Sequence, residues 1–209
     1  MRFPESGGIP DRNPNSITAK LLKKNHMQDL VIGLHEWEHS ESVDHLTGLK
    51  SLRVFENELD QFLGLTKRNQ LKVISVISID IDHFKNINDQ FGHPIGNEVL
   101  KEISAFLLRS VRANDSVARV GGEEIMVLLP GIDQQSASIK AEDLRLGIMH
   151  LRFAEYQNSI TASFGVNSSM DSTDRNKLIE HVDKALYVAK NSGRNNVKVY
   201  DKSMNNDKK

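Results

Sequence analysis

The chain of 209 residues contains no cysteine, which excludes disulfide bridges, a thiolate nucleophile, and zinc or iron–sulfur sites built on cysteine. It also has no apolar run near the ~20 residues that cross a bilayer, and its polar first residues lack an apolar signal core. A formal charge of −1 argues against a polybasic surface for nucleic acid or membrane. With 38% hydrophobic and 26% charged residues, the composition is typical of a folded domain. We therefore expect a soluble, cytoplasmic protein with no nucleic-acid or membrane partner.

The composition divides the chain into four segments. Residues 1–16 hold three of the five prolines and a Gly-Gly pair, which predicts a disordered leader. Residues 17–40 repeat apolar side chains at three- and four-residue steps without proline, which predicts an amphipathic helix. That helix either packs on its own domain or forms a stalk that dimerises, and the pattern favours neither. Residues 41–200 carry alternating helix and strand signals, and the polar residues 201–209 predict a tail.

Within residues 41–200, hydrophobic periodicity predicts helices and strands in mixed order. Thr47 is the expected N-cap of the first helix, over 48–64. The other expected elements are strands over 73–79, 116–120, 124–129, 160–166 and 197–200, and helices over 99–111, 134–151 and 174–190. Gly121-Gly122 between two short strands signals a hairpin. This order predicts an α+β fold with a largely antiparallel central sheet flanked by helices.

Acidic residues cluster at two of the predicted turns. Asp80 and Asp82 follow the strand over 73–79, where alternation places both on one face. Glu123 and Glu124 follow two glycines, which let the backbone turn tightly and let a bulky anion approach. Carboxylates without histidine or cysteine suit Mg²⁺ or Mn²⁺, whose coordination shell substrate phosphates often complete. The pattern favours metal-assisted phosphoryl or nucleotidyl transfer; the alternative is that these are solvated acids of turns.

Five short motifs follow one another between residues 41 and 200. They are Asp44-His45-Leu46-Thr47-Gly48-Leu49; Asp80-Ile81-Asp82-His83-Phe84-Lys85-Asn86-Ile87-Asn88-Asp89-Gln90-Phe91-Gly92-His93 with Gly96; Arg119-Val120-Gly121-Gly122-Glu123-Glu124-Ile125; Ser163-Phe164-Gly165-Val166; and Ala189-Lys190-Asn191-Ser192-Gly193-Arg194-Asn195. In order and spacing they resemble the GGDEF family of diguanylate cyclases. The resemblance implies a palm-like fold, similar to that of nucleotidyl cyclases and polymerases. It also implies condensation of two GTP into cyclic di-GMP with release of two pyrophosphates, at the subunit interface of a homodimer.

The resemblance further implies roles for individual residues. Asp80, the backbone carbonyl of Ile81 and Glu123 would hold Mg²⁺ or Mn²⁺. Glu123 or Glu124 would be the general base for the 3′-hydroxyl, and the spacing does not choose between them. The implied GTP contacts are Lys85, Lys190 and Arg194 at the phosphates, and Asn88, His93 and Asn97 around guanine.

An Arg-x-x-Asp sequence, Arg112 to Asp115, lies five residues before the two glycines. At this spacing, the resemblance implies an inhibitory site for the product, cyclic di-GMP. An arginine fork suits phosphate or guanine, and a carboxylate accepts from guanine N–H groups. The alternative is an ion pair at a helix end.

Four features depart from the family pattern. The mildest is Glu123, which replaces an aspartate and retains a carboxylate. Asn97 replaces an aspartate at a guanine contact, and its NH₂ group would lack a partner against guanine. We expect GTP recognition weaker by ~1–3 kcal/mol. The alternative is a cyclase with relaxed base selectivity, including a mixed cyclic GMP-AMP product. Ile125 replaces a phenylalanine and suggests a change of packing volume. Ser51-Leu52 replaces Asn-Arg, with loss of a structural ion pair.

Two other functions compete with the cyclase. A catalytically silent domain that serves as a GTP or cyclic di-GMP receptor is favoured by Asn97, whereas the intact Asp80, Glu123 and Glu124 favour an enzyme. The sequence His35-Glu36-Trp37-Glu38-His39 matches the H-E-x-x-H zinc protease pattern. It lacks the continuation that would supply a third ligand, so we interpret it as part of the polar stalk helix.

Overall fold

The computed structural model describes residues 42–153 and 159–205. All of them lie in the unit Glu41–Lys209. The predicted leader over 1–16 and the predicted helix over 17–40, with its H-E-x-x-H motif, lie outside the described residues. Within the described ranges, no helix is both long and apolar enough to cross a membrane.

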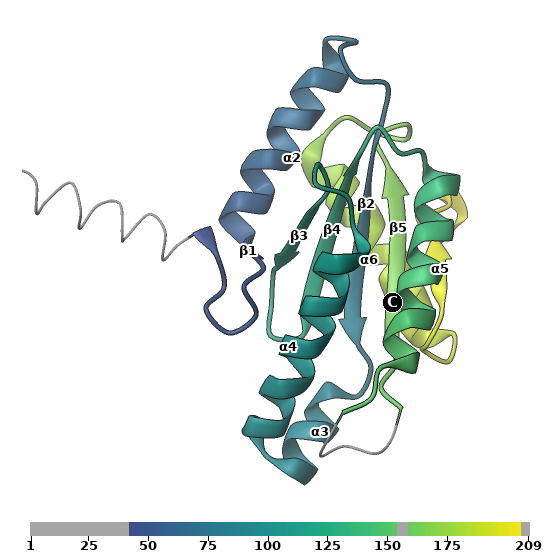
Figure 1. Cartoon of the computed structure of the whole chain (residues 1–209). Helices are drawn as coiled ribbons and strands as arrows, with labels where there is room; N and C mark the ends of the chain where they lie inside the picture. The colour runs from purple at the N-terminus through teal and green to yellow at the C-terminus, as the bar shows by residue number, and fades with distance from the viewer. Residues whose placement is uncertain (1–41, 154–158, 206–209) are drawn as a thin grey trace, which may run out of the picture. The chain divides into compact units, whose positions relative to one another are not determined.

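Six strands form one sheet in the order β1-β3-β4-β2-β5-β6 (Figure 1). The strands are β1 (Lys50–Ser51), β2 (Ile74–Ile81), β3 (Ser116–Arg119), β4 (Glu124–Pro130), β5 (Ala162–Ser168) and β6 (Val197–Val199). The central pairs β3–β4, β4–β2 and β2–β5 are antiparallel, whereas the outer pairs β1–β3 and β5–β6 are parallel. The predicted α+β fold around a largely antiparallel sheet is confirmed.

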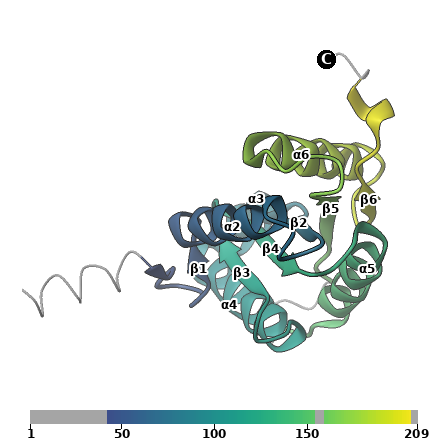
Figure 2. The same cartoon turned by 90° about the horizontal axis from the view of Figure 1, so that it is seen from above.

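Helices cover both faces of this sheet, with α4 and α6 on opposite sides (Figure 2). The helices are α2 (Leu52–Lys67), α3 (Phe84–Phe91), α4 (His93–Ser110), α5 (Gln134–His150) and α6 (Arg175–Asn191), followed by the 3₁₀ helix η1 (Lys202–Asn205). Each face carries its own apolar core. One core joins α3, α4 and α5 to the sheet and the other joins α2 and α6 to it.

The first predicted helix begins later than its sequence pattern indicated. Ser51, not Thr47, caps α2, and its hydroxyl accepts from the N–H of Val54 at 3.5 Å. Residues 50–51 instead pair with β3 as the short strand β1. Gly48 precedes them with a φ of 70°, a left-handed conformation that a helix does not allow. The prediction of a helix over 48–64 was therefore wrong at its start.

The helix expected over 99–111 is present as part of α4, which begins earlier, at His93, and the sequence pattern did not predict the separate helix α3 before it. Gly92 separates them with a φ of 82°, and Pro94 follows in the first turn of α4, where its missing N–H costs nothing. Only Phe84 and Ile87 are buried in α3. This apolar pattern is too short for periodicity to detect.

Gly165 fixes the position of α6 on the sheet. A Cβ at this position in β5 would lie 2.3 Å from the carbonyl oxygen of Val182 and 2.5 Å from the N of Leu186. Glycine thus lets the α6 backbone lie directly on β5. The same contact places the last turn of α6, with Lys190, beside the ends of the central strands.

Candidate active site

The predicted hairpin between β3 and β4 is present, and its turn contains the two glycines. The N–H groups of Val120 and Gly121 donate to the carbonyl of Glu124, at 2.9 and 3.3 Å. Arg119 holds the turn from within, because its Nε and Nη2 donate to the carbonyl of Gly122 at 3.0 and 2.7 Å. Backbone and guanidinium together fix the direction of the glutamates that follow.

Arg119 also connects this turn to the first motif of the domain. Its Nη1 donates to both carboxylate oxygens of Asp44, at 3.0 and 3.1 Å. Burial alone would raise the pKa of Asp44, but hydrogen bonds from Thr47 and Arg119 outweigh it and hold the pKa below its usual value. Arg119 was not among the residues for which the sequence predicts a role of their own. Its position two residues before a Gly-Gly turn could have indicated that its side chain holds the turn.

Asp80 lies near the end of β2, between a glutamate and a serine. It is opposite Glu124 in β4 and opposite Ser163 in β5, so the three side chains share one face of the sheet. The Asp80 side chain is 12% exposed, and its Oδ2 lies 2.6 Å from Nζ of Lys190. Burial raises the pKa of Asp80; Lys190 opposes this shift, while the negative charges of Glu123 and Glu124 add to it.

Asp82 connects neighbouring segments of the fold through the hydrogen bonds that its carboxylate accepts. Its carboxylate accepts from the hydroxyls of Thr161 and Ser163, at 2.7 and 2.6 Å, and from the N–H of Asn195 at 3.0 Å. The last bond anchors the loop after α6, where Arg194 and Asn195 both have positive φ, 61° and 46°. Asp82 therefore ties β2, β5 and this strained loop together.

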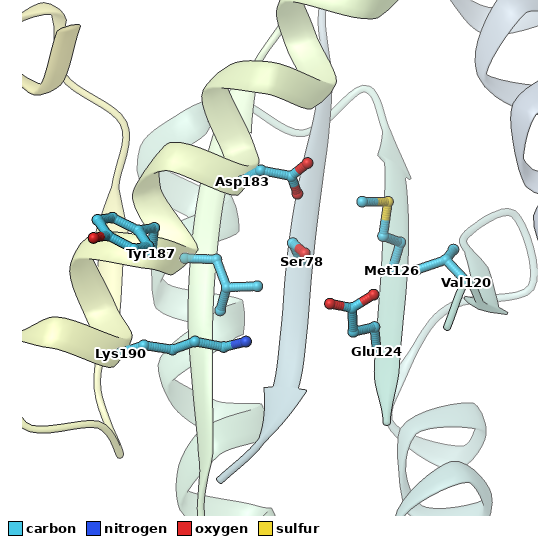
Figure 3. Close-up of a pocket in the computed structure, with 8 residues that line it drawn as sticks. Ser78, Val120, Glu124, Met126, Asp183, Tyr187 and Lys190 are labelled. Carbon is cyan, nitrogen blue, oxygen red and sulfur yellow. The ribbon is translucent and has the colours of Figure 1, made fainter. Parts of the chain in front are cut away.

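The two consecutive glutamates contribute to different cavities. Glu123 lines a cavity of about 490 Å³ next to α3 and α4. Glu124 lines another of about 320 Å³ between the sheet and α6 (Figure 3). Neighbouring residues at the start of a strand point to opposite faces, which explains the division. It separates two residues that the sequence could not tell apart.

The cavity beside Glu123 gathers most of the predicted GTP contacts. It is lined by Lys85, Asn88, His93 and Asn97, together with Arg119 and Gly122. Gly96 makes room for one of them, because a Cβ there would lie 2.0 Å from Oδ1 of Asn88. The motif thus needs glycine at 96 to let the Asn88 amide lie against α4.

The cavity beside Glu124 is lined by Lys190 and by a carboxylate that was not predicted from the sequence, Asp183. Figure 3 shows Asp183, on α6, directed into the same space as Glu124, Ser78 and Lys190. Desolvation of the Asp183 carboxylate, with the negative charge of Glu124, raises its pKa to about 6. The sequence did contain one indication of this position. Asp183 lies seven residues before Lys190, so two turns of a helix place both residues on the same face.

Some predicted site residues are not brought into either cavity. Arg194 is exposed in the loop after α6, and Ile81 is the buried last residue of β2. Arg112 and Asp115 form a turn before β3, in which the Asp115 carboxylate accepts from the N–H of Arg112 at 2.8 Å. The alternative prediction was an ion pair between these two side chains. Among residues 42–153 and 159–205, the ion pairs do not include one between Arg112 and Asp115.

The donor set fits a hard divalent cation that substrate helps to hold. No group of three or more acidic or histidine residues with metal-site geometry occurs among the described residues. Yet Asp80, Glu123 and Glu124 interact electrostatically, and Lys190 pairs with Asp80. Oxygen ligands that are too few to complete a shell are typical of Mg²⁺ sites, where substrate phosphates and water supply the rest.

The fold and this acid-lined turn define a known class of domain. The chain belongs to the family described as "Diguanylate cyclase, GGDEF domain", whose model matches residues 41–196. It is 37% identical over 163 residues to the probable diguanylate cyclase DgcT of Escherichia coli, covering 76% of this chain and 35% of that protein. It is 39% identical over 161 residues to the response regulator PleD of Caulobacter vibrioides, covering 74% and 35%. The chain therefore spans about a third of the length of these relatives.

Solved structures support the same fold. The coiled coil and GGDEF domain of DgcB from Caulobacter crescentus, in complex with c-di-GMP, gives a TM-score of 0.79 at 26% identity, covering 88% of this chain and all of that one. The active GGEEF domain of a diguanylate cyclase from Vibrio cholerae gives 0.66 at 34% identity, covering 70% and 94%. The predicted palm-like GGDEF fold is confirmed.

Proposed function

We propose that this chain is a diguanylate cyclase, which condenses two GTP into cyclic di-GMP and releases two pyrophosphates. The observation that carries the proposal is the cavity of about 490 Å³, which combines cationic, amide and carboxylate groups. Lys85, Asn88 and Glu123 line it together. These are the groups that a phosphate, a purine edge and a metal-bound triphosphate each require. Family membership supports the same activity.

Recognition of the base is assigned to the two asparagines of this cavity. An amide offers one acceptor and two donor hydrogens, so Asn88 suits the mixed donor and acceptor edge of guanine. Asn97 would supply one acceptor where an aspartate supplies two oxygens. Its NH₂ group would be left unpaired against guanine N–H groups but could donate to an adenine nitrogen. His93 would line the same pocket.

The triphosphate would be held at the ends of the central strands. Asp80, the carbonyl of Ile81 and Glu123 would ligate Mg²⁺ or Mn²⁺. When bound, that cation would neutralise the triphosphate, favour ionisation of the 3′-hydroxyl and stabilise the leaving pyrophosphate. Lys85, Lys190 and Arg194 would contact phosphate oxygens as cations.

Glu124 is our candidate for the general base. Glu123 lines the nucleotide cavity and is assigned to the metal, whereas Glu124 faces the separate cavity beside α6. An unligated carboxylate can accept the 3′-hydroxyl proton, and the resulting alkoxide attacks the α-phosphate of the second GTP. The new 3′–5′ phosphodiester bond forms as the bond to pyrophosphate breaks. The step occurs twice, once in each direction.

The symmetry of the product supports catalysis by a homodimer. Cyclic di-GMP contains two identical guanosine halves, and within the described part of one chain the predicted guanine contacts Asn88, His93 and Asn97 line the same cavity. Two subunits facing each other would bring two GTP molecules together in opposite directions. The exposed Arg112 and the neighbouring Asp115 would bind finished cyclic di-GMP and provide feedback inhibition.

The test is to incubate the purified chain with Mg²⁺ and GTP, ATP or both, and to identify products by mass spectrometry. We expect cyclic di-GMP from GTP alone, and its loss in Glu124→Gln. Glu102→Gln, which changes an exposed glutamate on α4, is the matched control and should retain activity. A mixed cyclic GMP-AMP product would indicate relaxed base selection through Asn97. GTP binding without any cyclic dinucleotide would favour the receptor function instead.

A further inference from the structure

The ammonium of Lys190 pairs with the carboxylate that the cyclase proposal assigns to the metal. Lys190 is in the last turn of α6, and its Nζ lies 2.6 Å from Oδ2 of Asp80. The Asp80 side chain is 12% exposed, and that of Lys190 is 31% exposed. Among the described residues, Lys190 is the cationic side chain that forms an ion pair with Asp80. A buried carboxylate needs such a partner to stay ionised.

The surroundings of this pair are strongly negative. Glu124 is directly opposite Asp80 in the β2–β4 ladder, and Glu123 adds its charge to the same region. Lys190 therefore offsets part of a cluster of three carboxylates. A divalent cation at Asp80 would meet the Lys190 ammonium at close range, where like charges repel strongly. The ammonium and the cation thus compete for one carboxylate.

Lys190 has other acceptors within its cavity. Glu124 and Asp183 line that cavity with it, and Figure 3 shows the three side chains directed toward the same space. The lysine stem is flexible, so the ammonium can leave Asp80 without movement of α6. A triphosphate brought to the strand ends would offer it a more highly charged acceptor than a single carboxylate.

We infer that Lys190 guards Asp80 against divalent cations until a nucleotide phosphate draws the ammonium away. This inference rests on the proposed function, since it assumes that Asp80 ligates metal and that Lys190 contacts phosphate. Metal and nucleotide would then bind cooperatively, because each removes the same ion pair. Such coupling is reciprocal, so either ligand raises the affinity of the other by the same factor.

The test measures Mn²⁺ binding to the full chain without nucleotide, from the electron paramagnetic resonance signal of free Mn²⁺. We expect Lys190→Met to bind Mn²⁺ about five- to tenfold more tightly than the wild type, since a partly exposed ion pair no longer competes. Lys184→Met is the matched control. It removes the same charge from α6 but breaks a surface pair with Glu180, and should leave the affinity unchanged. Asp80→Asn should abolish the tight binding of Lys190→Met.

Equal or weaker Mn²⁺ binding by Lys190→Met than by Lys184→Met would overturn the inference. Lys190→Gln provides a second variant if the methionine protein does not fold, as judged by circular dichroism. The cyclase assay on the wild type separates the two proposals. Cyclic di-GMP synthesis with no gain in Mn²⁺ affinity would reject the guard alone. A gain that Asp80→Asn removes, without any cyclic dinucleotide, would reject the cyclase alone.

Discussion

The two faces of the central sheet differ in how far their apolar cover extends. On the face covered by α4 and α5, Ile77, Ile79 and Ile81 of β2 are all buried in one core. On the face covered by α2 and α6, the apolar residues of β2 stop at Val76, and Ser78 and Asp80 follow. The side chains of β2 are thus apolar to the end of the strand on one face, but only along its first half on the other face.

Because of this difference, residues of β2 that stabilise the fold and residues that could take part in chemistry lie on opposite faces of the same strand. Side chains alternate between faces, so each polar residue at the end of β2 leaves the opposite core intact. Glu124 forms a row with Asp80 and Ser163 across the sheet, and Glu124 lines the 320 Å³ cavity between the sheet and α6. Charged groups can therefore gather there without burial in the main core. The comparison predicts that substitutions on the two faces have different consequences.

The largest expected effect is on the apolar face. Phe164 in β5 is fully buried in the core under α4 and α5, so Phe164→Ala should lower the free energy of unfolding by about 3–5 kcal/mol. Ser78→Ala, on the opposite face, should change it by less than about 1 kcal/mol, because a hydroxyl at a cavity wall is removed without leaving a void. Urea denaturation of both variants measures the contrast. Similar losses would show that the two faces are equally packed.

The second prediction concerns the contact that positions α6. Gly165→Ala would place a Cβ 2.3 Å from the carbonyl oxygen of Val182, so the helix backbone must move. We expect a loss of about 1–3 kcal/mol in stability from this overpacking. Cyclase activity should fall as well, because Lys190 moves with the helix.

Gly64→Ala is the control for this substitution. It lies in α2, where the nearest atom to an added Cβ is the flexible end of Arg68 at 3.6 Å. Alanine in a helix interior should raise stability by up to about 1 kcal/mol. Denaturation of both variants should therefore show shifts of opposite sign. A stabilised Gly165→Ala would mean that α6 does not lie directly on β5.

Runs of β-forming residues and glycine signals were enough to predict much of the sheet and its acidic edge. The β-rich run over 73–79 places Asp80 at a strand end, and Gly121-Gly122 predicts the hairpin. The motif resemblance supplied the residues of the larger cavity, including Asn88 and Asn97. These features are local in sequence, so the pattern contains them.

Features that depend on distant residues were not predictable in this way. Asp82 appeared to belong with Asp80, but its hydrogen bonds to Thr161 and Asn195 arise only when β5 and the loop after α6 fold against it. Asp183 resembled any polar residue on a helix, because its neighbour Glu124 comes from a different element, β4. The late start of α2 likewise follows from pairing of residues 50–51 with β3.

The third prediction tests the fit inside the nucleotide cavity. Gly96→Ala would place a Cβ 2.0 Å from Oδ1 of Asn88 and displace that amide, while the helix itself tolerates alanine. GTP affinity should fall about tenfold, the loss of roughly one well-placed hydrogen bond, with little change in stability. Calorimetric titration with GTP and Mg²⁺ measures this. Asn88→Ala should lower GTP affinity by about the same factor as Gly96→Ala. Wild-type GTP affinity in Gly96→Ala would argue against a role for Asn88.

The smallest expected effect lies on the polar face, at Asp183. Its pKa is raised from 3.8 to about 6 by desolvation and by the charge of Glu124. The folded protein therefore holds this proton more tightly than the unfolded chain does. The stability that the proton contributes is present below about pH 4 and is lost as the pH rises through about 6.

Asp183→Asn removes this titration while it preserves shape. At pH 7.5 the variant should be more stable than the wild type, because it carries no negative charge beside Glu124. The gain should be only about 1–3 °C in Tm, because Asp183 is exposed enough for solvent to screen much of that charge. Below about pH 4 the two proteins should melt together, since the wild-type carboxyl is then protonated in both states. Asp143→Asn, at an exposed position on α5, is the control. It should leave Tm unchanged both at pH 7.5 and below about pH 4. A variant that melts below the wild type at pH 7.5 would show that Lys190 stabilises the Asp183 carboxylate more than Glu124 and desolvation oppose it.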